Sequence, residues 1–229
     1  MVLLKDVNMK YPGSRAETLR DIDLTIQDGE FVFLVGPSGS GITTIIKLLT
    51  GEIRATGGQI EVNGFDLRTM KRRNLPKLRR SLGVIFQDYR LIKDMTVYEN
   101  VAFAMRVIGA SNREIKKRVP YVLDLVDLSG REDRYPRELS GGVQQRVAIA
   151  RALVNSPDMI IADAPPGNLD PARSLEIMLL FQKINELGTT VLIVTHEKEL
   201  VNAFSKRVVS LSDGCLISDG MDGYYGYES

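Results

Sequence analysis

The chain has 229 residues, of which 44% are hydrophobic and 26% are charged, and its formal net charge is +1 at pH 7. This composition is typical of an ordinary globular domain, and it gives no general electrostatic basis for binding nucleic acid or an anionic membrane surface. The single cysteine, Cys215, excludes an internal disulfide and fits a reducing compartment. No apolar run approaches the ~18 residues of a membrane-spanning helix, so we do not expect the chain to cross a bilayer.

The first 87 residues are predicted to form mainly short strands. Residues 21–26 alternate polar and apolar side chains, as a half-buried strand does, whereas residues 31–35 are apolar throughout. Further strand-like segments with turn residues nearby occur at 2–11, 59–62 and 83–86. The segment Arg68–Arg80 is rich in lysine and arginine. We interpret it as a solvated helix face, with a contact to acidic groups of a partner as the alternative.

The later residues are predicted to form helices first, and then helices that alternate with buried strands. Helical periodicity covers 97–107, 114–128 and a third segment ending near Val154, and Pro120 should kink the second helix or begin a new one. Strands are predicted at 158–163, 189–195, 207–211 and 215–218, and helices at 171–187 and 197–204. Such alternation predicts a parallel sheet covered on both faces.

We therefore predict a single α/β domain over residues 1–229. Its core, which includes an antiparallel β subdomain, would be formed by residues 1–87 and 156–229. Residues 88–155 would form an inserted helical subdomain.

A glycine-rich loop connects the strand at 31–35 to the next helix. Its sequence, Gly36-Pro37-Ser38-Gly39-Ser40-Gly41-Ile42-Thr43-Thr44, matches the phosphate-binding template G-x-x-x-x-G-K-[ST] except at Ile42, which replaces the lysine. The glycines let backbone N–H groups approach an anion, the helix adds its positive N-terminal end, and the Thr43 hydroxyl is placed to hold magnesium. On this loop alone, a glycine-rich turn that binds nothing is an equal alternative.

The missing lysine is the only full positive charge that the template places in the loop. A charge-assisted hydrogen bond contributes roughly 1.5–3 kcal/mol, so we expect phosphate affinity to fall about tenfold or more. Lys47 is not expected to replace it, because Lys47 lies five residues from Ile42 and points to another face of the helix.

Other short motifs follow at spacings that strengthen the case for nucleotide binding. They are Tyr11, Gln87, Leu139-Ser140-Gly141-Gly142-Val143-Gln144-Gln145-Arg146, a buried strand ending at Asp163, Gly167-Asn168-Leu169-Asp170, and His196 after an apolar strand. With the glycine-rich loop, this series resembles the ATP-binding-cassette (ABC) ATPases over nearly the whole chain. The resemblance implies a P-loop NTPase core, ATP and Mg²⁺ as cofactors, and a homodimer with composite ATP sites.

The resemblance also implies a role for each motif. Thr43, Gln87 and Asp163 would hold the metal, Tyr11 would stack on adenine, and His196 would act at the γ-phosphate. The phosphates would lie against the loop residues Gly36, Ser38, Gly39, Ser40, Gly41, Ile42, Thr43 and Thr44. Ser140, Gly141 and Gly142 would contact the nucleotide bound by the opposite subunit. The simpler interpretations are an ordinary strand-end aromatic for Tyr11 and a helix cap for Ser140.

Four residues depart from the family pattern: Ile42 in the loop, Ala164 at the position of the catalytic glutamate, Pro166 in place of a threonine, and Val143 in the signature motif. Alanine cannot orient water or accept a proton, and a positioned general base contributes typically about 10²–10⁴-fold. We therefore expect the chain to keep the fold and a partial nucleotide site, with weak ATP binding and strongly impaired hydrolysis.

Within the family, the segments 78–91 and 96–101 and the tyrosine-rich C-terminus resemble the ATP-binding subunits of bacterial cell division. That resemblance implies an FtsX-like membrane protein as partner and a location at the cytoplasmic face of the cell membrane. We expect no nucleic acid partner, because the chain has a single cassette, no coiled-coil insertion and no net basic charge. A non-catalytic regulatory scaffold on a membrane partner, and the ATP-binding subunit of an ABC importer or exporter, are the alternatives.

Overall fold

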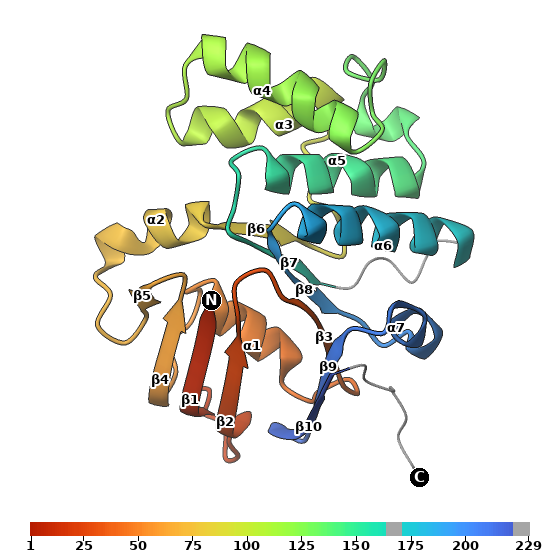
Figure 1. Ribbon diagram of the computed structural model, residues 1–229. Helices are drawn as coiled ribbons and strands as arrows, with labels where there is room; N and C mark the ends of the chain where they lie inside the picture. The colour runs from red at the N-terminus through yellow and green to blue at the C-terminus, as the bar shows by residue number, and fades with distance from the viewer. Residues whose placement is uncertain (164–170, 222–229) are drawn as a thin grey trace.

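The computed structural model describes residues 1–163 and 171–221, which form two sheets with helices packed around them (Figure 1). The strands are β1 (Val2–Met9), β2 (Leu19–Ile26), β3 (Phe31–Val35), β4 (Gly57–Val62), β5 (Phe65–Asp66), β6 (Leu82–Ile85), β7 (Met159–Asp163), β8 (Thr190–Val194), β9 (Arg207–Ser212) and β10 (Cys215–Gly220). The α-helices are α1 (Ile42–Leu49), α2 (Leu75–Arg80), α3 (Val97–Val107), α4 (Asn112–Leu125), α5 (Gly141–Leu153), α6 (Pro171–Glu186) and α7 (Lys198–Phe204), and short 3₁₀ turns occur at Arg72–Asn74 and Pro136–Glu138.

The two sheets differ in strand direction. One has the order β2-β1-β4-β5 and is antiparallel, with Val2 opposite Ile26 on one side and Val62 on the other. The other has the order β10-β9-β3-β8-β7-β6, in which all pairs are parallel except β9 with β10. This confirms the predicted α/β fold with an antiparallel β subdomain. The two-residue strand β5 was not predicted, because two residues carry no periodicity.

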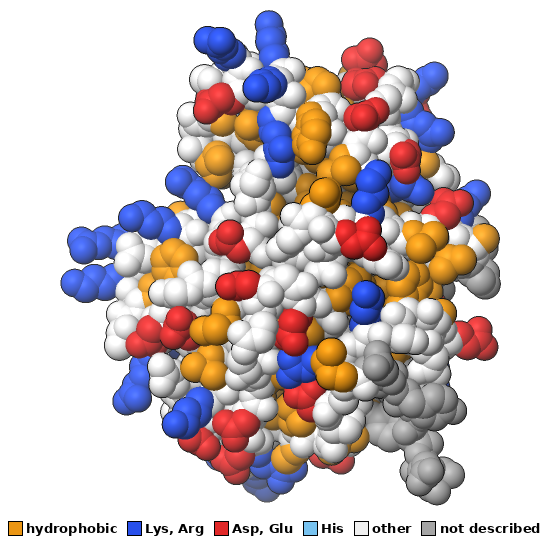
Figure 2. Space-filling view, in the orientation of Figure 1, with side chains coloured by type: hydrophobic (Ala, Val, Ile, Leu, Met, Phe, Trp, Pro, Cys, Tyr) orange, Lys and Arg blue, Asp and Glu red, His pale blue; other side chains and the backbone are white. Residues whose placement is uncertain are grey.

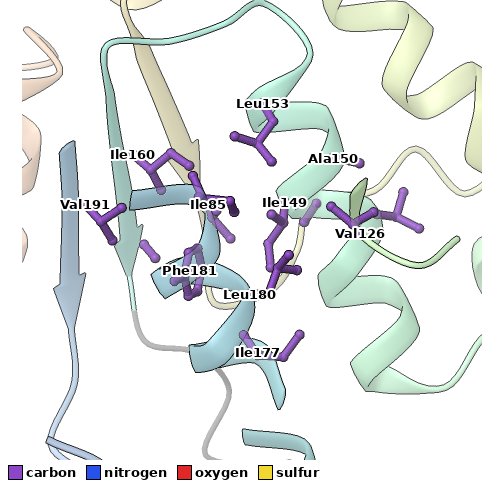
Figure 3. Packing of buried hydrophobic residues seen from close by; sticks show 14 of the residues in the cluster. Ile85, Val126, Ile149, Ala150, Leu153, Ile160, Ile177, Leu180, Phe181 and Val191 are labelled. Atoms are coloured by element: carbon purple, nitrogen blue, oxygen red, sulfur yellow. The ribbon is translucent and has the colours of Figure 1, made fainter. Parts of the chain in front are cut away.

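The larger sheet is covered on both faces, as predicted. Successive side chains of a strand point to opposite faces, and in β7 Ile160 belongs to one buried cluster while Ile161 belongs to the other. In the first cluster, strand residues such as Ile160 and Val191 face Ile149 of α5 and Phe181 of α6 (Figure 3). The second cluster joins the sheet to α1 and to the antiparallel sheet. The glycine-rich loop therefore begins and ends on buried elements.

Helices α3, α4 and α5 pack on one another in the upper part of Figure 1. Capping boxes begin α3, where Thr96 pairs with Glu99, and α4, where Ser111 pairs with Glu114. Pro120 lies inside α4, so the alternative that a new helix begins there is wrong. Among the described residues, no helix has both the length and the apolar character needed to cross a bilayer.

Candidate nucleotide-binding site

The glycine-rich loop lies between β3, which ends at Val35, and α1, which begins at Ile42. Gly41 precedes the helix with φ of 104°, and a Cβ there would lie 2.5 Å from Cδ2 of Leu19. A Cβ on Gly36 would lie 2.4 Å from the carbonyl oxygen of Leu211. Both positions therefore need glycine for close approach, and Gly41 also needs it for its left-handed backbone. The strand–loop–helix context that the template requires is present.

The crest of the loop is open to solvent while its base is buried. Pro37, Ser38 and Gly39 are exposed, as is Thr43 in the first turn of α1. The Ser40 hydroxyl is buried and has no hydrogen-bond partner among the residues that the structure describes. An unpaired buried hydroxyl costs about 1–3 kcal/mol, so the hydrogen bonds of this loop are incomplete without a ligand.

Ile42 takes part in the core instead of facing the loop's crest. Its side chain is 9% exposed and belongs to the apolar cluster around α1. Its Cδ1 atom lies 3.2 Å from the position that a Cβ on Gly36 would occupy. The residue at the lysine position thus fills space at the base of the loop with hydrocarbon and offers no donor to a phosphate.

Tyr11 lies beside the loop, as its predicted role requires. Its hydroxyl is 3.3 Å from the Thr44 hydroxyl, although the two residues are far apart in sequence. The contact connects the end of β1 to the first turn of α1. Stacking on adenine stays a prediction.

A cavity of about 600 Å³ opens next to the loop and brings Thr43 and Asp163 together. Asp163 is the last residue of β7 and is half-buried. Burial raises the pKa of the Asp163 carboxyl above its ordinary value, and the positive charge of Arg90 lowers it in part. Lys47 lines the same cavity, because it lies one helical turn beyond Thr43, on a different face from Ile42 as predicted.

The segment after β6 has an unusual backbone. Tyr89 and Arg90 both have positive φ, at 56° and 46°, which is uncommon for residues other than glycine. The guanidinium of Arg151, on α5, donates hydrogen bonds of 2.7 Å to the Tyr89 carbonyl and 2.6 Å to the Arg90 carbonyl. Sequence reasoning missed both arginines as site residues, because neither belongs to a nucleotide-binding motif, and Arg90 falls only within the segment 78–91 quoted for its family resemblance.

Other predicted site residues lie outside the cavity of Thr43 and Asp163. Gln87 and His196 are exposed, and neither lines that cavity in the part of the chain that the structure describes. Ala164, Pro166 and the Gly167–Asp170 motif lie outside the described residues.

The signature motif begins helix α5. Ser140 is its N-cap residue, yet the Ser140 side chain makes no capping hydrogen bond, so the simple capping interpretation is wrong for this structure. Gly141 and Gly142 form the first turn of the helix. Val143 is half-buried and packs against the first buried cluster, the one that includes Ile149 and Phe181, which explains how an apolar residue is accommodated there.

Comparison with known proteins agrees with this geometry. The family model for ABC transporters matches residues 19–166. The chain is 50% identical over 226 residues to the cell division ATP-binding protein FtsE of Bacillus subtilis (strain 168), covering 99% of each chain. It is 48% identical over 228 residues to FtsE of Streptococcus pneumoniae serotype 2 (strain D39 / NCTC 7466), covering 100% of this chain and 99% of that one.

Among solved structures, the dimeric post-hydrolysis state of the ATP-binding cassette MJ0796, bound to ADP and Pi, matches with a TM-score of 0.86 at 35% identity. The match covers 99% of this chain and 100% of that one. The strand–loop–helix site, the order of the motifs and these similarities agree, and the chain therefore belongs to the ABC transporter family of ATP-binding proteins, within its FtsE-like group.

Proposed function

We propose that the chain is an FtsE-like ATP-binding subunit that acts in cell division, docks on an FtsX-like membrane protein and hydrolyses ATP poorly. The observation that carries the loss of hydrolysis is the burial of Ile42. This apolar residue occupies the position of the template lysine and packs in the core, so the loop brings no positive side chain to the phosphates. Ala164, at the position of the general base, points to the same conclusion from the sequence.

The residues present fit a magnesium ion that arrives with the nucleotide. Thr43 supplies a hydroxyl and Asp163 a carboxylate at one cavity, and oxygen ligands are those that magnesium prefers. Among the described residues, no cluster of three or more histidine, cysteine or acidic side chains could hold a metal by itself. When bound, the ion would neutralise charge on the phosphates. Thr43 and Asp163 would be its protein ligands at this cavity, and we propose Gln87 as a further ligand.

ATP would bind through the backbone of the loop and the N-terminal end of α1. The open crest at residues 37–39 and the unpaired Ser40 hydroxyl support a loop that a ligand completes. Without a lysine, the affinity should be weak. His196 would reach the γ-phosphate only after the site closes, because it is exposed here.

A homodimer with shared ATP sites is the proposed assembly. The exposed Ser140 hydroxyl, which is not used to cap α5, is available to a nucleotide on a second copy. The solved relative bound to ADP and Pi is itself dimeric. Weak ATP binding should make this dimer weak in the present chain.

A groove between the sheet core and the helical layer supports docking on a membrane partner. The groove has a volume of about 970 Å³ and is lined by residues from α2, β6, α3 and α5. Its apolar wall includes Phe103 and Val107, which are 39% and 65% exposed, and its basic edge includes Arg72, Arg79 and Arg80. Lysine and arginine side chains gather over α2 at the left of the molecule (Figure 2).

An apolar groove with a basic edge fits an amphipathic segment with acidic groups, as a cytoplasmic part of a membrane protein would offer. Docking there would hold the chain at the cytoplasmic face of the membrane. Tyr89 and Leu91, in the segment after Gln87, are partly buried and pack against the first buried cluster.

The deciding experiment measures magnesium-dependent ATP turnover of the purified chain beside the restored variant carrying Ile42→Lys and Ala164→Glu. We expect little turnover from the native chain and a clear gain in the restored variant. A native rate that equals the restored one and disappears in Thr43→Ala would contradict the proposal. Co-purification with an FtsX-like protein, instead of the membrane subunits of an importer or exporter, tests the partner.

A further inference from the structure

The native loop lacks a cation, but the cavity beside it does not. Three basic side chains line the cavity that Thr43 and Asp163 share: Lys47, Arg79 and Arg90. Arg79 is used elsewhere, because its Nε atom donates a hydrogen bond of 3.2 Å to the Thr50 carbonyl. Lys47 lies one helical turn further from the start of α1 than Thr43 does. Arg90 comes from a different element, the turn after β6.

Arg90 is held in place by several independent contacts. Its backbone has φ of 46°, and its carbonyl accepts the hydrogen bond from Arg151. Its guanidinium lies 3.7 Å from the centre of the Phe86 ring, within the range of a cation–π contact. Its Nε atom lies 3.3 Å from a carboxylate oxygen of Asp88. A cation fixed in this way loses little freedom when a ligand arrives.

The charge of Arg90 also reaches the metal side of the site. Arg90 lines the same cavity as Thr43 and Asp163, so its guanidinium is on the side of the site where the proposed metal ligands lie. The Arg90 side chain is 60% exposed, so its donors remain accessible to a ligand in the cavity. A planar guanidinium suits the oxygens of a phosphate.

We infer that Arg90 supplies the cation for the terminal phosphate of ATP that the glycine-rich loop lacks. The inference rests on the proposed nucleotide site, in which the loop's N–H groups hold the inner phosphates. Because Arg90 enters from the side of Thr43 and Asp163, it should interact with a third phosphate and little with the first two. The chain should therefore prefer ATP to ADP through this one side chain.

The test is isothermal titration calorimetry of the isolated full chain with Mg-ATP and with Mg-ADP. Arg90→Gln should weaken Mg-ATP binding about tenfold, and Mg-ADP binding by less than about threefold. Arg90→Lys, which keeps the charge but not the planar guanidinium, should lose less ATP affinity than Arg90→Gln does. In an Ile42→Lys background, Arg90→Gln should cost only about twofold for Mg-ATP, because the loop then carries its own cation. Lys47→Gln, which removes another cation of the same cavity, is the matched control and should change ATP affinity little.

Four results would overturn the inference: equal losses for ATP and ADP, the same loss in both backgrounds, no loss in Arg90→Gln, or no Mg-ATP binding by the native chain. Thermal unfolding of each variant establishes that it is folded. None of these results depends on turnover. An ordinary rate of hydrolysis in the native chain would refute the proposed loss of hydrolysis. The role of Arg90 would still be decided by comparing how much Arg90→Gln weakens Mg-ATP binding and Mg-ADP binding.

Discussion

Arg151 on α5 donates a 2.7 Å hydrogen bond to the carbonyl oxygen of Tyr89, whose backbone is left-handed with φ of 56°. Burial lowers the pKa of the Arg151 guanidinium, and the nearby charge of Arg90 lowers it further. A cation is thus kept partly buried in order to hold two carbonyls of a strained turn. Such a turn persists only when its surroundings stabilise it.

Removal of this guanidinium should destabilise the chain and loosen the turn. We expect Arg151→Met to lower the free energy of unfolding by about 1–3 kcal/mol, because the Tyr89 and Arg90 carbonyls lose hydrogen bonds from a charged donor. Chemical denaturation monitored by circular dichroism would measure it. Arg113→Met, at an exposed position of α4, is the control and should change stability by less than about 0.5 kcal/mol. Equal stabilities of the two variants would show that the Arg151 contacts contribute nothing.

A lysine at position 42 should restore nucleotide affinity at some cost in stability. Ile42→Lys should tighten Mg-ATP binding about tenfold or more through a charge-assisted hydrogen bond. The same change should destabilise the apolar cluster around α1, where Ile42 is 9% exposed. Ile42→Met keeps an apolar side chain without the charge, so it should leave affinity unchanged in the same calorimetric titration. A gain in affinity with methionine would mean that shape, not charge, limits binding.

The helix caps give a direct comparison between two hydroxyl residues. Thr96 accepts a hydrogen bond from the Glu99 N–H at the start of α3, whereas Ser140 makes no such bond at the start of α5. Thr96→Ala should therefore cost about 1 kcal/mol of stability, and Ser140→Ala close to none. Thermal unfolding measures both. In the Ile42→Lys and Ala164→Glu variant, Ser140→Ala should still weaken the ATP-dependent dimer seen by size-exclusion chromatography.

Glu114 should make stability depend on pH in the acidic range. The side-chain and backbone hydrogen bonds from Ser111 hold the pKa of the Glu114 carboxyl below its ordinary value of 4.5. A carboxyl whose pKa is lower in the folded state stabilises the fold above its unfolded pKa, and this contribution disappears as pH falls through the folded value. The melting temperature of the native chain should therefore exceed that of Glu114→Gln near neutral pH, and the difference should shrink as the pH falls below 4.5. A difference that persists in acid would contradict this origin.

Charge reversal at the groove should weaken docking of the membrane partner. Arg72 and Arg80 line the basic edge of the groove and are exposed, so Arg72→Glu with Arg80→Glu should reduce co-purification with an FtsX-like protein several-fold without unfolding the chain. The matched control is Lys116→Glu with Lys117→Glu, which makes the same change of charge at exposed positions of α4. Equal losses in both double variants would indicate a general effect of charge.

The order of the long helices and strands could be predicted from the sequence. Features that depend on contacts between residues far apart in the chain could not. Apolar runs such as Phe31–Val35 and Thr190–Val194 are buried throughout, and they could be read from their composition alone. The left-handed backbone of Tyr89 and Arg90 could not be predicted from the sequence. Neither residue is glycine, and the donor that stabilises this backbone lies on α5. The cavity of Thr43 and Asp163 likewise joins residues on separate elements.

Helix α5 begins at Gly141, in the signature motif, and carries Arg151 ten residues later. Ten helical residues span about 15 Å of stiff rod. If a nucleotide on a second copy shifted the first turn of α5, Arg151 would move with the helix. Its hydrogen bonds would then displace the segment after Gln87. The helix thus joins the proposed contact with a second copy to the carbonyls of Tyr89 and Arg90.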